Sequence, residues 1–315
     1  MRNRLTRYKT SYMMLVILCI MTICPPTSAN AQERKMSFDI FSGAEFNLRD
    51  ISFNRQYDVY IYLSPGFKWY FGDHWQVAGQ MFVDIINQYK DPYYDIYYDY
   101  QGGPVHFGIL DVSKEVKLGG LYCKASAGFF TCSRYGLDLK LFMPVTNWLA
   151  FEAQAGLTGR FYTYNGWGFS PMQRFSGTIG GDIYLPRSNT QLRGVVGSYI
   201  YKDLGAEVEV IRHFRHSSVS LYANWNNKGT EAVDHYDGGF KVVVMIPPYR
   251  RKQRLVNVRP ISNLSLPYSI NVHQWTNRMY NTDPEENMRD GWFSRDLLDW
   301  GSHTMEPDFI ITPKE

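Results

Sequence analysis

The sequence predicts an all-β fold, an antiparallel transmembrane β-barrel of about 12 strands with a periplasmic C-terminal tail. Three observations lead to this prediction. The chain begins with an export signal, and no later run of about eighteen apolar residues could form a transmembrane helix. Between residues 38 and 246, short segments alternate between apolar and polar side chains, which is the period of a β-strand. An exported chain of this kind can be secreted, periplasmic or a membrane barrel, and the strand pattern favours the barrel.

The export signal occupies the start of the chain. Basic side chains cluster in the first nine residues, residues 12–24 are mostly apolar, and Ala29-Asn30-Ala31 is a small-x-small cleavage site. We therefore expect residues 1–31 to be a signal peptide that is cleaved after Ala31. Cleavage leaves Cys123 and Cys132, which nine residues of extended chain would hold beyond disulfide reach. We expect two unpaired thiols unless the chain reverses near Ala127-Gly128.

Composition narrows the class of protein. Aromatic residues make up 16% of the 315 residues, which favours strands and amphipathic interfaces. The formal net charge of +3 is small for this length. A protein that binds nucleic acid through a broad phosphate-neutralising surface would be more basic, so we expect no nucleic-acid partner.

The predicted strands follow one another as hairpins. The segment from Leu204 to Val210 has apolar side chains at even positions, whereas Glu207 and Glu209 face the other way. The fourth predicted strand is less regular, because Asp111 interrupts its apolar face. The twelve predicted strands cover, in order, about 38–46, 57–71, 75–85, 105–118, 121–129, 135–143, 149–157, 175–185, 191–201, 204–210, 218–225 and 240–246.

The connections between these strands alternate in length. Tight turns close every second pair, and the longest loops are about 88–104 and 226–237. Short turns on one rim and longer loops on the other are typical of an outer-membrane barrel, and an even strand count places both ends in the periplasm. Tryptophans near turn edges suit an aromatic girdle at the lipid interface. These tryptophans are Trp69, Trp75, Trp148 and Trp225.

The domain organisation follows from where the alternation stops. We expect an outer-membrane barrel over residues 32–248 and a periplasmic, partly irregular tail over residues 249–315, which does not alternate cleanly. A soluble β-sandwich would show the same alternation and remains an alternative.

The first candidate site is the barrel interior. In the predicted register a set of charged side chains points into the lumen, where it could form a polar path for a hydrophilic or charged polymer. Alternatively, these charges neutralise one another and fill a narrow bore. The lumen-facing candidates are Asp58, Lys68, Asp84, Lys124, Asp138, Lys140, Glu152, Asp182, Arg193, Glu207, Glu209 and Lys241.

The second candidate site is the loop from Asp91 to Tyr100. Tyrosine rings and hydroxyls suit contacts with sugars, and we expect an extracellular glycan-contact site there or else a solvated surface loop. The spacing of its aspartates does not match a calcium-binding loop, so no metal site is predicted. The glycan-contact candidates are Tyr93, Tyr94, Tyr97 and Tyr98.

Catalytic signatures are absent from the sequence. His213 and His216 are three residues apart, so on a strand they would face opposite ways and make a poor metal pair. Hydrogen bonding to the backbone of a turn explains Ser217 and Ser218 better than a nucleophilic role does. No nucleophile elbow, zinc-protease helix or nucleotide-binding glycine loop is present. We therefore expect no catalytic residue and no cofactor.

The segments 175–186, Gly197-Ser198-Tyr199 and 204–214 resemble the YjbH-like family, and residues 238–248 are similar to the closing strand of that family. Members are outer-membrane proteins associated with exopolysaccharide or capsule production. The resemblance implies a non-catalytic barrel in the outer membrane of a Gram-negative cell that assists assembly or export of a surface polysaccharide. Its partners would be outer-membrane lipid, polysaccharide and other proteins of the export machinery.

Three alternative functions remain open at this point. One is a general diffusion or structural barrel, and another is a barrel enzyme that modifies lipid or glycan. The third is a secreted adhesin built as a β-sandwich.

Overall fold

The structure is a computed structural model, and all regular secondary structure in the part of the chain that it describes is β-strand. No helix in this part is long and apolar enough to cross a membrane. The described residues are 36–47, 58–71, 74–88, 104–146, 148–163, 166–214, 217–227, 236–245, 256–258, 261–267 and 278–284.

The strands alternate in direction along nearly the whole chain. Most are 9 to 14 residues long, which is enough to cross the apolar layer of a membrane at a tilt. In chain order they are β1 Met36–Asn47, β2 Asp58–Phe71, β3 Trp75–Asn87, β4 Val105–Leu118, β5 Leu121–Phe130, β6 Arg134–Thr146, β7 Leu149–Tyr162, β8 Gly168–Phe169, β9 Arg174–Leu185, β10 Thr190–Ser198, β11 Leu204–His213, β12 Ser217–Asn226, β13 Tyr236–Met245, β14 Val256–Val258 and β15 Ile261–Pro267.

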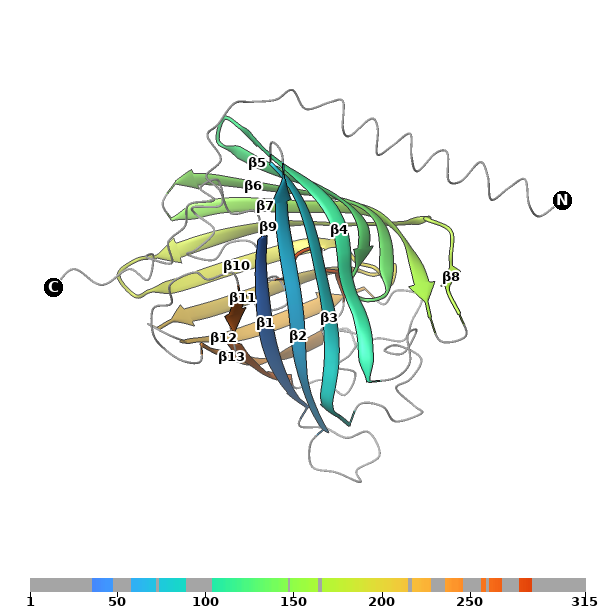
Figure 1. Cartoon of the computed structure of the whole chain (residues 1–315). Helices are drawn as coiled ribbons and strands as arrows, with labels where there is room; N and C mark the ends of the chain where they lie inside the picture. Colours follow the sequence, from blue (N-terminus) through green and yellow to red (C-terminus); the bar gives the residue numbers. More distant parts are fainter. Residues whose placement is uncertain are drawn as a thin grey trace.

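Strand pairing forms a circuit. From β2 to β13 each strand pairs antiparallel with the next, except that short β8 pairs only with the end of β7, and β7 continues directly to β9. Strand β15 then pairs with β13 on one side and with β1 on the other, and β1 pairs with β2 over residues 36–47. In Figure 1, β1 to β3 cross in front of β9 to β12 at a steep angle, as the tilted strands of opposite barrel walls do.

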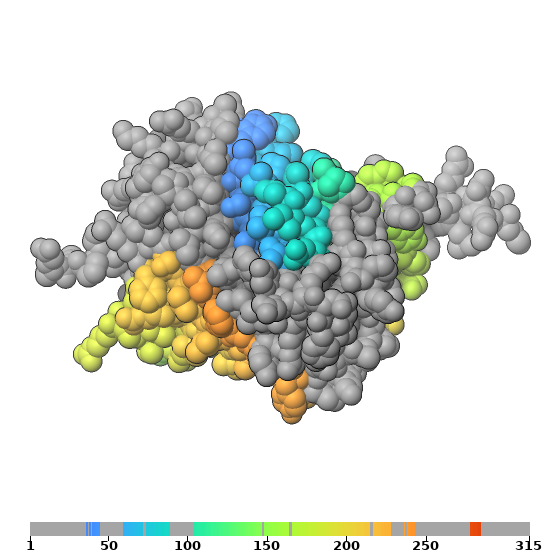
Figure 2. Space-filling view, turned by 90° about the horizontal axis from the view of Figure 1, so that it is seen from below, coloured from blue at the N-terminus to red at the C-terminus, as the bar shows by residue number. Residues whose placement is uncertain are grey.

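The circuit closes where β1 meets β15, and this seam is held by few residue pairs. Strand β1 joins β15 in parallel through Ala44↔Leu264 and Glu45↔Ser265, and it joins β14 in parallel through three residue pairs. Without β8 and β14, thirteen of the fifteen strands form the circuit, and an odd number of strands requires one parallel pair. The space-filling view from below shows the blue and cyan atoms of β1 to β3 side by side, with yellow and orange atoms of β12 and β13 in the lower left (Figure 2).

The barrel predicted from sequence is confirmed, with one addition and one correction. Each of the twelve predicted strands has its counterpart among β1 to β7 and β9 to β13. The thirteenth, β15, comes from residues 249–315, which were predicted to be a periplasmic tail. That prediction was wrong for Ile261–Pro267, which lies in the barrel wall. Because β15 adds one strand to the twelve predicted, the predicted even strand count was wrong as well.

The wall is apolar outside and polar inside. On hairpin β11–β12, Val208 is 58% exposed and Leu221 is 64% exposed, whereas Glu209, between Val208 and Val210, is 1% exposed. The same contrast recurs around the circuit: Lys124 and Lys140 are each 1% exposed, although both are charged. A soluble sandwich would bury its apolar face, so this arrangement distinguishes the two folds that the sequence left open.

A β-bulge explains the irregular fourth strand. The register between β3 and β4 shifts at Gln80/Met81, so Gly108 is an extra residue that has no direct partner on β3. The bulge lets Phe107 and Leu110 share the outer face and turns Asp111 inward, where it is 1% exposed. A Cβ atom at Gly108 would lie 2.6 Å from the ring of Phe82, so only glycine fits.

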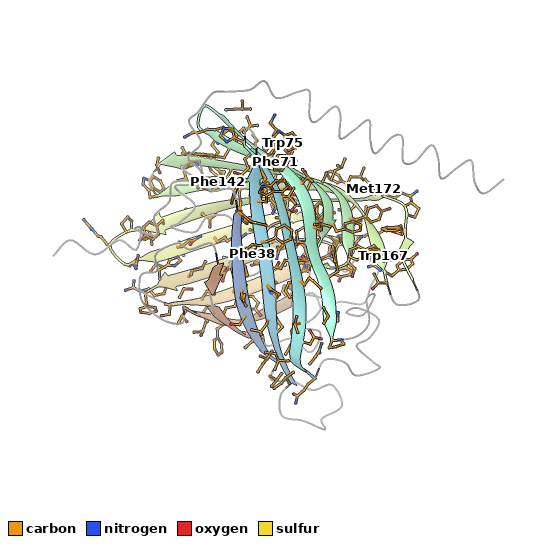
Figure 3. All side chains as sticks on the ribbon, viewed as in Figure 1. Phe38, Phe71, Trp75, Phe142, Trp167 and Met172 are labelled. Carbon is orange, nitrogen blue, oxygen red and sulfur yellow. The ribbon has the colours of Figure 1, made fainter. Side chains whose placement is uncertain are left out.

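Aromatic side chains form two bands on the outer face. We call the end where the tight turns join β2–β3, β4–β5, β6–β7, β9–β10 and β11–β12 the turn rim, and the opposite end the loop rim. Near the turn rim lie Phe38, Trp69, Phe71, Trp148 and Phe214, and near the loop rim lie Tyr162, Trp167, Phe169, Phe175, Trp225 and Tyr236, all exposed. Figure 3 shows Phe71 beside Trp75, and Trp167 well apart from them. Aliphatic side chains cover the wall between the bands, which is the pattern of a membrane-spanning barrel.

Candidate functional site

The predicted lumen residues lie on the inner face of the wall. Six of them are fully buried, and Asp84, Glu152, Arg193, Glu207 and Lys241 are half-buried. The structure describes the strand position of Asp58 but not its side chain. The six buried residues are Lys68, Lys124, Asp138, Lys140, Asp182 and Glu209. The proposed role of these residues as a path for a polymer stays a prediction.

Some of these charges neutralise one another across the inner face of the wall. Arg193 on β10 pairs with Glu152 on β7 at 2.7 Å between Nη2 and Oε1. Lys241 on β13 lies 3.9 Å from Glu209 on β11. Asp84 contacts His106 at 2.8 Å, near the loop rim. Oppositely charged groups inside a barrel stabilise one another more than on a surface, because little water screens them.

The lumen also holds a segment of the chain itself, residues 278–284, which we call the lumen segment. It begins beside the β10–β11 connection at the loop rim and ends among side chains of β2, β3 and β5 closer to the turn rim. Seven residues thus reach from one wall of the barrel to the other. The prediction of a periplasmic tail over residues 249–315 is therefore wrong for residues 278–284 as well, because they lie inside the barrel.

Arg278 anchors the start of the segment. Its Nε and Nη2 donate hydrogen bonds to Oδ2 of Asp203 at 3.1 and 2.8 Å, and its guanidinium lies 3.8 Å from the ring centre of Tyr199. Both partners belong to the inward loop, residues 199–203, which connects β10 to β11 and was predicted to continue the ninth strand as far as Tyr201. Burial raises the pKa of the Tyr199 phenol to about 12, so this side chain stays neutral.

The inward loop is itself fixed by arginines of the wall. Arg134 on β6 donates to the carbonyl of Ile200 at 3.1 Å, and Arg174 on β9 donates to the carbonyl of Tyr199. The amide of Ile200 in turn donates to the carbonyl of Arg278 at 3.1 Å. Loop and lumen segment therefore form one packed unit, held by charge-assisted hydrogen bonds.

Tyr280 lies against the inner face of β5 to β7. Its hydroxyl donates to Oδ1 of Asp138 at 2.7 Å, and its ring stacks on Phe130 of β5 with ring centres 5.1 Å apart. The ring is 1% exposed. This side chain combines an apolar contact with a hydrogen bond to a carboxylate, and both hold the segment against the wall.

Asp283 ends the segment in a cationic pocket. One carboxylate oxygen lies 3.4 Å from Nζ of Lys68 and accepts a hydrogen bond from Nε2 of Gln76 at 3.0 Å; the other accepts a hydrogen bond from Lys124. Burial alone would raise the pKa of Asp283, but the ammonium groups of Lys124, Lys68 and Lys140 together lower it well below its usual range. Asp283 is therefore ionised at every physiological pH.

Glycines in the wall make room for the lumen segment. A Cβ atom at Gly156 on β7 would overlap the Tyr280 hydroxyl, and a Cβ atom at Gly205 on β11 would overlap the Arg278 guanidinium. At Gly66 on β2 a Cβ atom would lie 3.1 Å from the Pro284 side chain. The wall thus has recesses opposite three residues of the segment, which indicates that the segment is part of the folded barrel.

Sequence reasoning missed this site because no period marks it. Residues 278–284 do not alternate, and Arg278, Tyr280 and Asp283 are ordinary residues of a polar stretch. The one available signal was on the wall, where Lys68, Lys124 and Lys140 were predicted to face the lumen.

The remaining sequence-based candidates contribute little. The tyrosines Tyr93, Tyr94, Tyr97 and Tyr98 lie outside the described residues. Ser218 lies opposite His213 in the β11–β12 pairing, but Nε2 of His213 contacts Gln191 at 2.9 Å. Within the described ranges no group of three or more His, Cys, Asp and Glu residues could hold a metal ion.

Cys123 and Cys132 were predicted to be two unpaired thiols. No disulfide joins Cys123, on β5, to Cys132, in the turn between β5 and β6. The Sγ atom of Cys132 lies 3.7 Å from the carbonyl oxygen of Met279 in the lumen segment. Burial raises the pKa of the Cys132 thiol to about 11, so the reactive thiolate is scarce at neutral pH.

The wall is apolar outside and polar inside, and the lumen contains a segment of the same chain. Together, these two features define an outer-membrane-type β-barrel. No protein-family model matches the sequence, and no curated protein matches it. Among solved structures, the chain is similar to OmpT, an outer membrane protein of Vibrio cholerae, folded in vitro, with 10% identity and a TM-score of 0.30 over 68% of this chain and 82% of that one. A mutant of OmpT that lacks loop L8 gives 10% identity and a TM-score of 0.32, over 67% of this chain and 88% of that one.

Proposed function

We propose that this protein is a non-catalytic barrel of the outer membrane that takes part in the assembly or export of a surface exopolysaccharide or capsule. The observation that supports a membrane role most directly is the inverted wall, with exposed aliphatic and aromatic side chains outside and buried charges inside. The polysaccharide role rests on the YjbH-like pattern of strands β9 to β13. Outer-membrane lipid, polysaccharide and proteins of the export machinery are its proposed partners, and its signal peptide is proposed to be cleaved after Ala31.

The filled lumen favours this role over a general diffusion barrel. Arg278, Tyr280 and Asp283 bridge opposite walls through contacts of the kind that hold buried charge pairs together. A general diffusion pore needs a lasting water-filled path, whereas this lumen holds ordered side chains. Wild-type protein in a planar bilayer is therefore expected to show little steady conductance.

The test is deletion of the gene in its native host, followed by measurement of the amount and attachment of surface polysaccharide. We expect both to fall and to be restored by the wild-type gene. Unchanged polysaccharide in the deletion strain would contradict the proposal.

A matched variant tests the non-catalytic part of the proposal. Ser218, opposite His213, is the residue that a barrel enzyme would use as nucleophile at this rim. A Ser218→Ala gene is expected to restore polysaccharide as fully as the wild-type gene, with an unchanged lipid profile. Failure of this variant to restore, despite normal folding, would instead favour the enzyme alternative.

A further inference from the structure

The pocket around Asp283 has the features of a carboxylate-binding site. Lys68 and Lys124 come from different strands, β2 and β5, and they are 7% and 1% exposed. Both contact the same carboxylate, and the amide of Gln76 on β3 donates to it as well. Two ammonium groups and an amide that converge on one carboxylate are the donors expected for recognition of an anion in a site with little water.

The wall keeps this pocket in place without help from Asp283. Lys124 also lies 3.6 Å from Glu115 on β4, and Asp111 of the same strand faces the same interior. Gln80, four residues along β3 from Gln76 and on the same face, donates to Ser64 at 2.5 Å and to the carbonyl of Pro284 at 3.2 Å. A site built on paired strands keeps its geometry when a ligand leaves, because the strand ladders and not the ligand hold its backbone.

An aromatic surface lies on the same inner face as the pocket, six residues along β5 from Lys124 toward the loop rim. Phe130 presents a face that the Tyr280 ring now covers, and the recess at Gly156 lies beside the Tyr280 hydroxyl. Asp138, which accepts the hydrogen bond of Tyr280, would be left facing the same space. An aromatic face, hydroxyl acceptors and a cationic end suit a sugar that carries a carboxylate, since sugars stack on aromatic rings and hydrogen-bond through hydroxyls.

We propose that Lys68, Lys124 and Gln76 form a binding site for the carboxylate of an acidic glycan, and that Asp283 occupies this site as an internal ligand. The inference deepens the proposed function, on which it rests, by naming the class of polymer. Glycan binding then requires displacement of the lumen segment, so occupancy of the site and opening of the lumen are coupled.

Displacement of the lumen segment breaks a set of polar contacts and one small apolar cluster. The ion pairs of Arg278 and Asp283 and the hydrogen bond of Tyr280 exchange for bonds to water or to the glycan when the segment leaves. The apolar contacts that are lost are those of Tyr280 with Phe130, Ile200 and Tyr201, and those of Met279 with the same cluster. A tethered carboxylate acts as a competitor at an effective concentration of about 1 mM, so it weakens the apparent affinity of a free ligand.

The experiment measures binding of trigalacturonate to the full-length protein in detergent micelles by titration calorimetry, with maltotriose and inorganic phosphate as comparison ligands. Asp283→Asn removes the competing charge, and we expect it to bind trigalacturonate about tenfold more tightly than wild type does, because the site no longer needs to be vacated. Maltotriose, which lacks a carboxylate, is expected not to bind in either protein.

Two further variants make the result specific to the pocket. Adding Lys68→Gln to Asp283→Asn is expected to abolish the gain. Adding Lys241→Gln instead is expected to leave the gain intact. Lys241 pairs with Glu209, and both lie on the other side of the seam from the pocket. If Asp283→Asn alone fails to fold, as judged by its gel mobility before and after heating, Asp203→Asn loosens the Arg278 end and is expected to raise affinity while leaving the pocket unaltered.

Three outcomes would overturn the inference: equal affinity of wild type and both loosening variants, retention of the gain after Lys68→Gln, or equally tight binding of maltotriose or inorganic phosphate. The proposed function fails separately. A polysaccharide defect in the deletion strain without trigalacturonate binding would support the proposed function and contradict the acidic-glycan site. Binding without a polysaccharide defect would support the site and contradict the proposed function.

Discussion

At the scale of single residues, the barrel is organised by the match between lumen side chains and the segment that fills the lumen. Tyr280 and Arg278 each lie against a wall glycine, and Asp283 lies between two buried lysines. A buried ammonium group without a partner is strongly destabilising, and Lys124 has two acidic partners, Glu115 of the wall and Asp283 of the segment. Asp138 is also a buried charged group, and its carboxylate accepts hydrogen bonds from both Gln154 and Tyr280.

Gly156→Ala tests the fit of Tyr280. The new methyl group would overlap the Tyr280 hydroxyl and break its hydrogen bond to Asp138, which is worth about 1.5–3 kcal/mol as a bond to a charged group. The lumen segment would then leave its place more often, by a factor of about ten or more. Because Cys132 contacts Met279 of the segment, maleimide labelling of Cys132 in a Cys123→Ser background is expected to quicken by a similar factor.

Gly194→Ala is the matched control. A Cβ atom at Gly194 meets nothing within 4 Å, so this variant is expected to label at the rate of the Cys123→Ser parent. Equal labelling of the Gly156→Ala and Gly194→Ala proteins would show that the wall does not form a recess for Tyr280.

At the scale of elements, hairpins were predictable and departures from regular pairing were not. Hairpin β11–β12 appears where Val208 and Leu221 alternate with polar residues. Strand β4 has the predicted bounds, but its bulge at Gly108 resets the alternation, which no local pattern reveals. Strand β15 escaped prediction because it is only seven residues long and ends at Pro267, which weakens a strand pattern.

Leu221→Arg tests whether the outer face of a hairpin meets lipid. Leu221 lies at the middle of β12 and is 64% exposed, so an arginine there would face the centre of the apolar layer. The expected loss in free energy of unfolding is about 2–4 kcal/mol in lipid bilayers, measured by urea titration.

Phe214→Arg provides the depth control for that variant. Phe214 is 52% exposed and follows β11 at the turn rim, where an arginine reaches the interface at a loss of about 0–1 kcal/mol. If both variants lose less than about 0.5 kcal/mol, as substitutions on a water-facing surface do, the outer face does not meet lipid.

At the scale of the whole molecule, the fold could be predicted further than the site. Period-2 alternation predicts which face of each strand meets lipid, and it predicts that Lys124 and Glu209 face the interior, where each is 1% exposed. It does not report what fills the interior, because the contact between Asp283 and Lys124 joins residues 159 positions apart through a segment without periodicity. The seam, where β15 enters between β13 and β1, also depends on long-range pairing.

The central claim is that the chain folds as a membrane-spanning barrel with an apolar outer wall, and cell fractionation tests it most directly. We expect the full-length protein in the outer-membrane fraction, released only by detergent, with faster gel migration before heating than after it. Recovery in the soluble fraction without detergent, with the same migration before and after heating, would contradict the account.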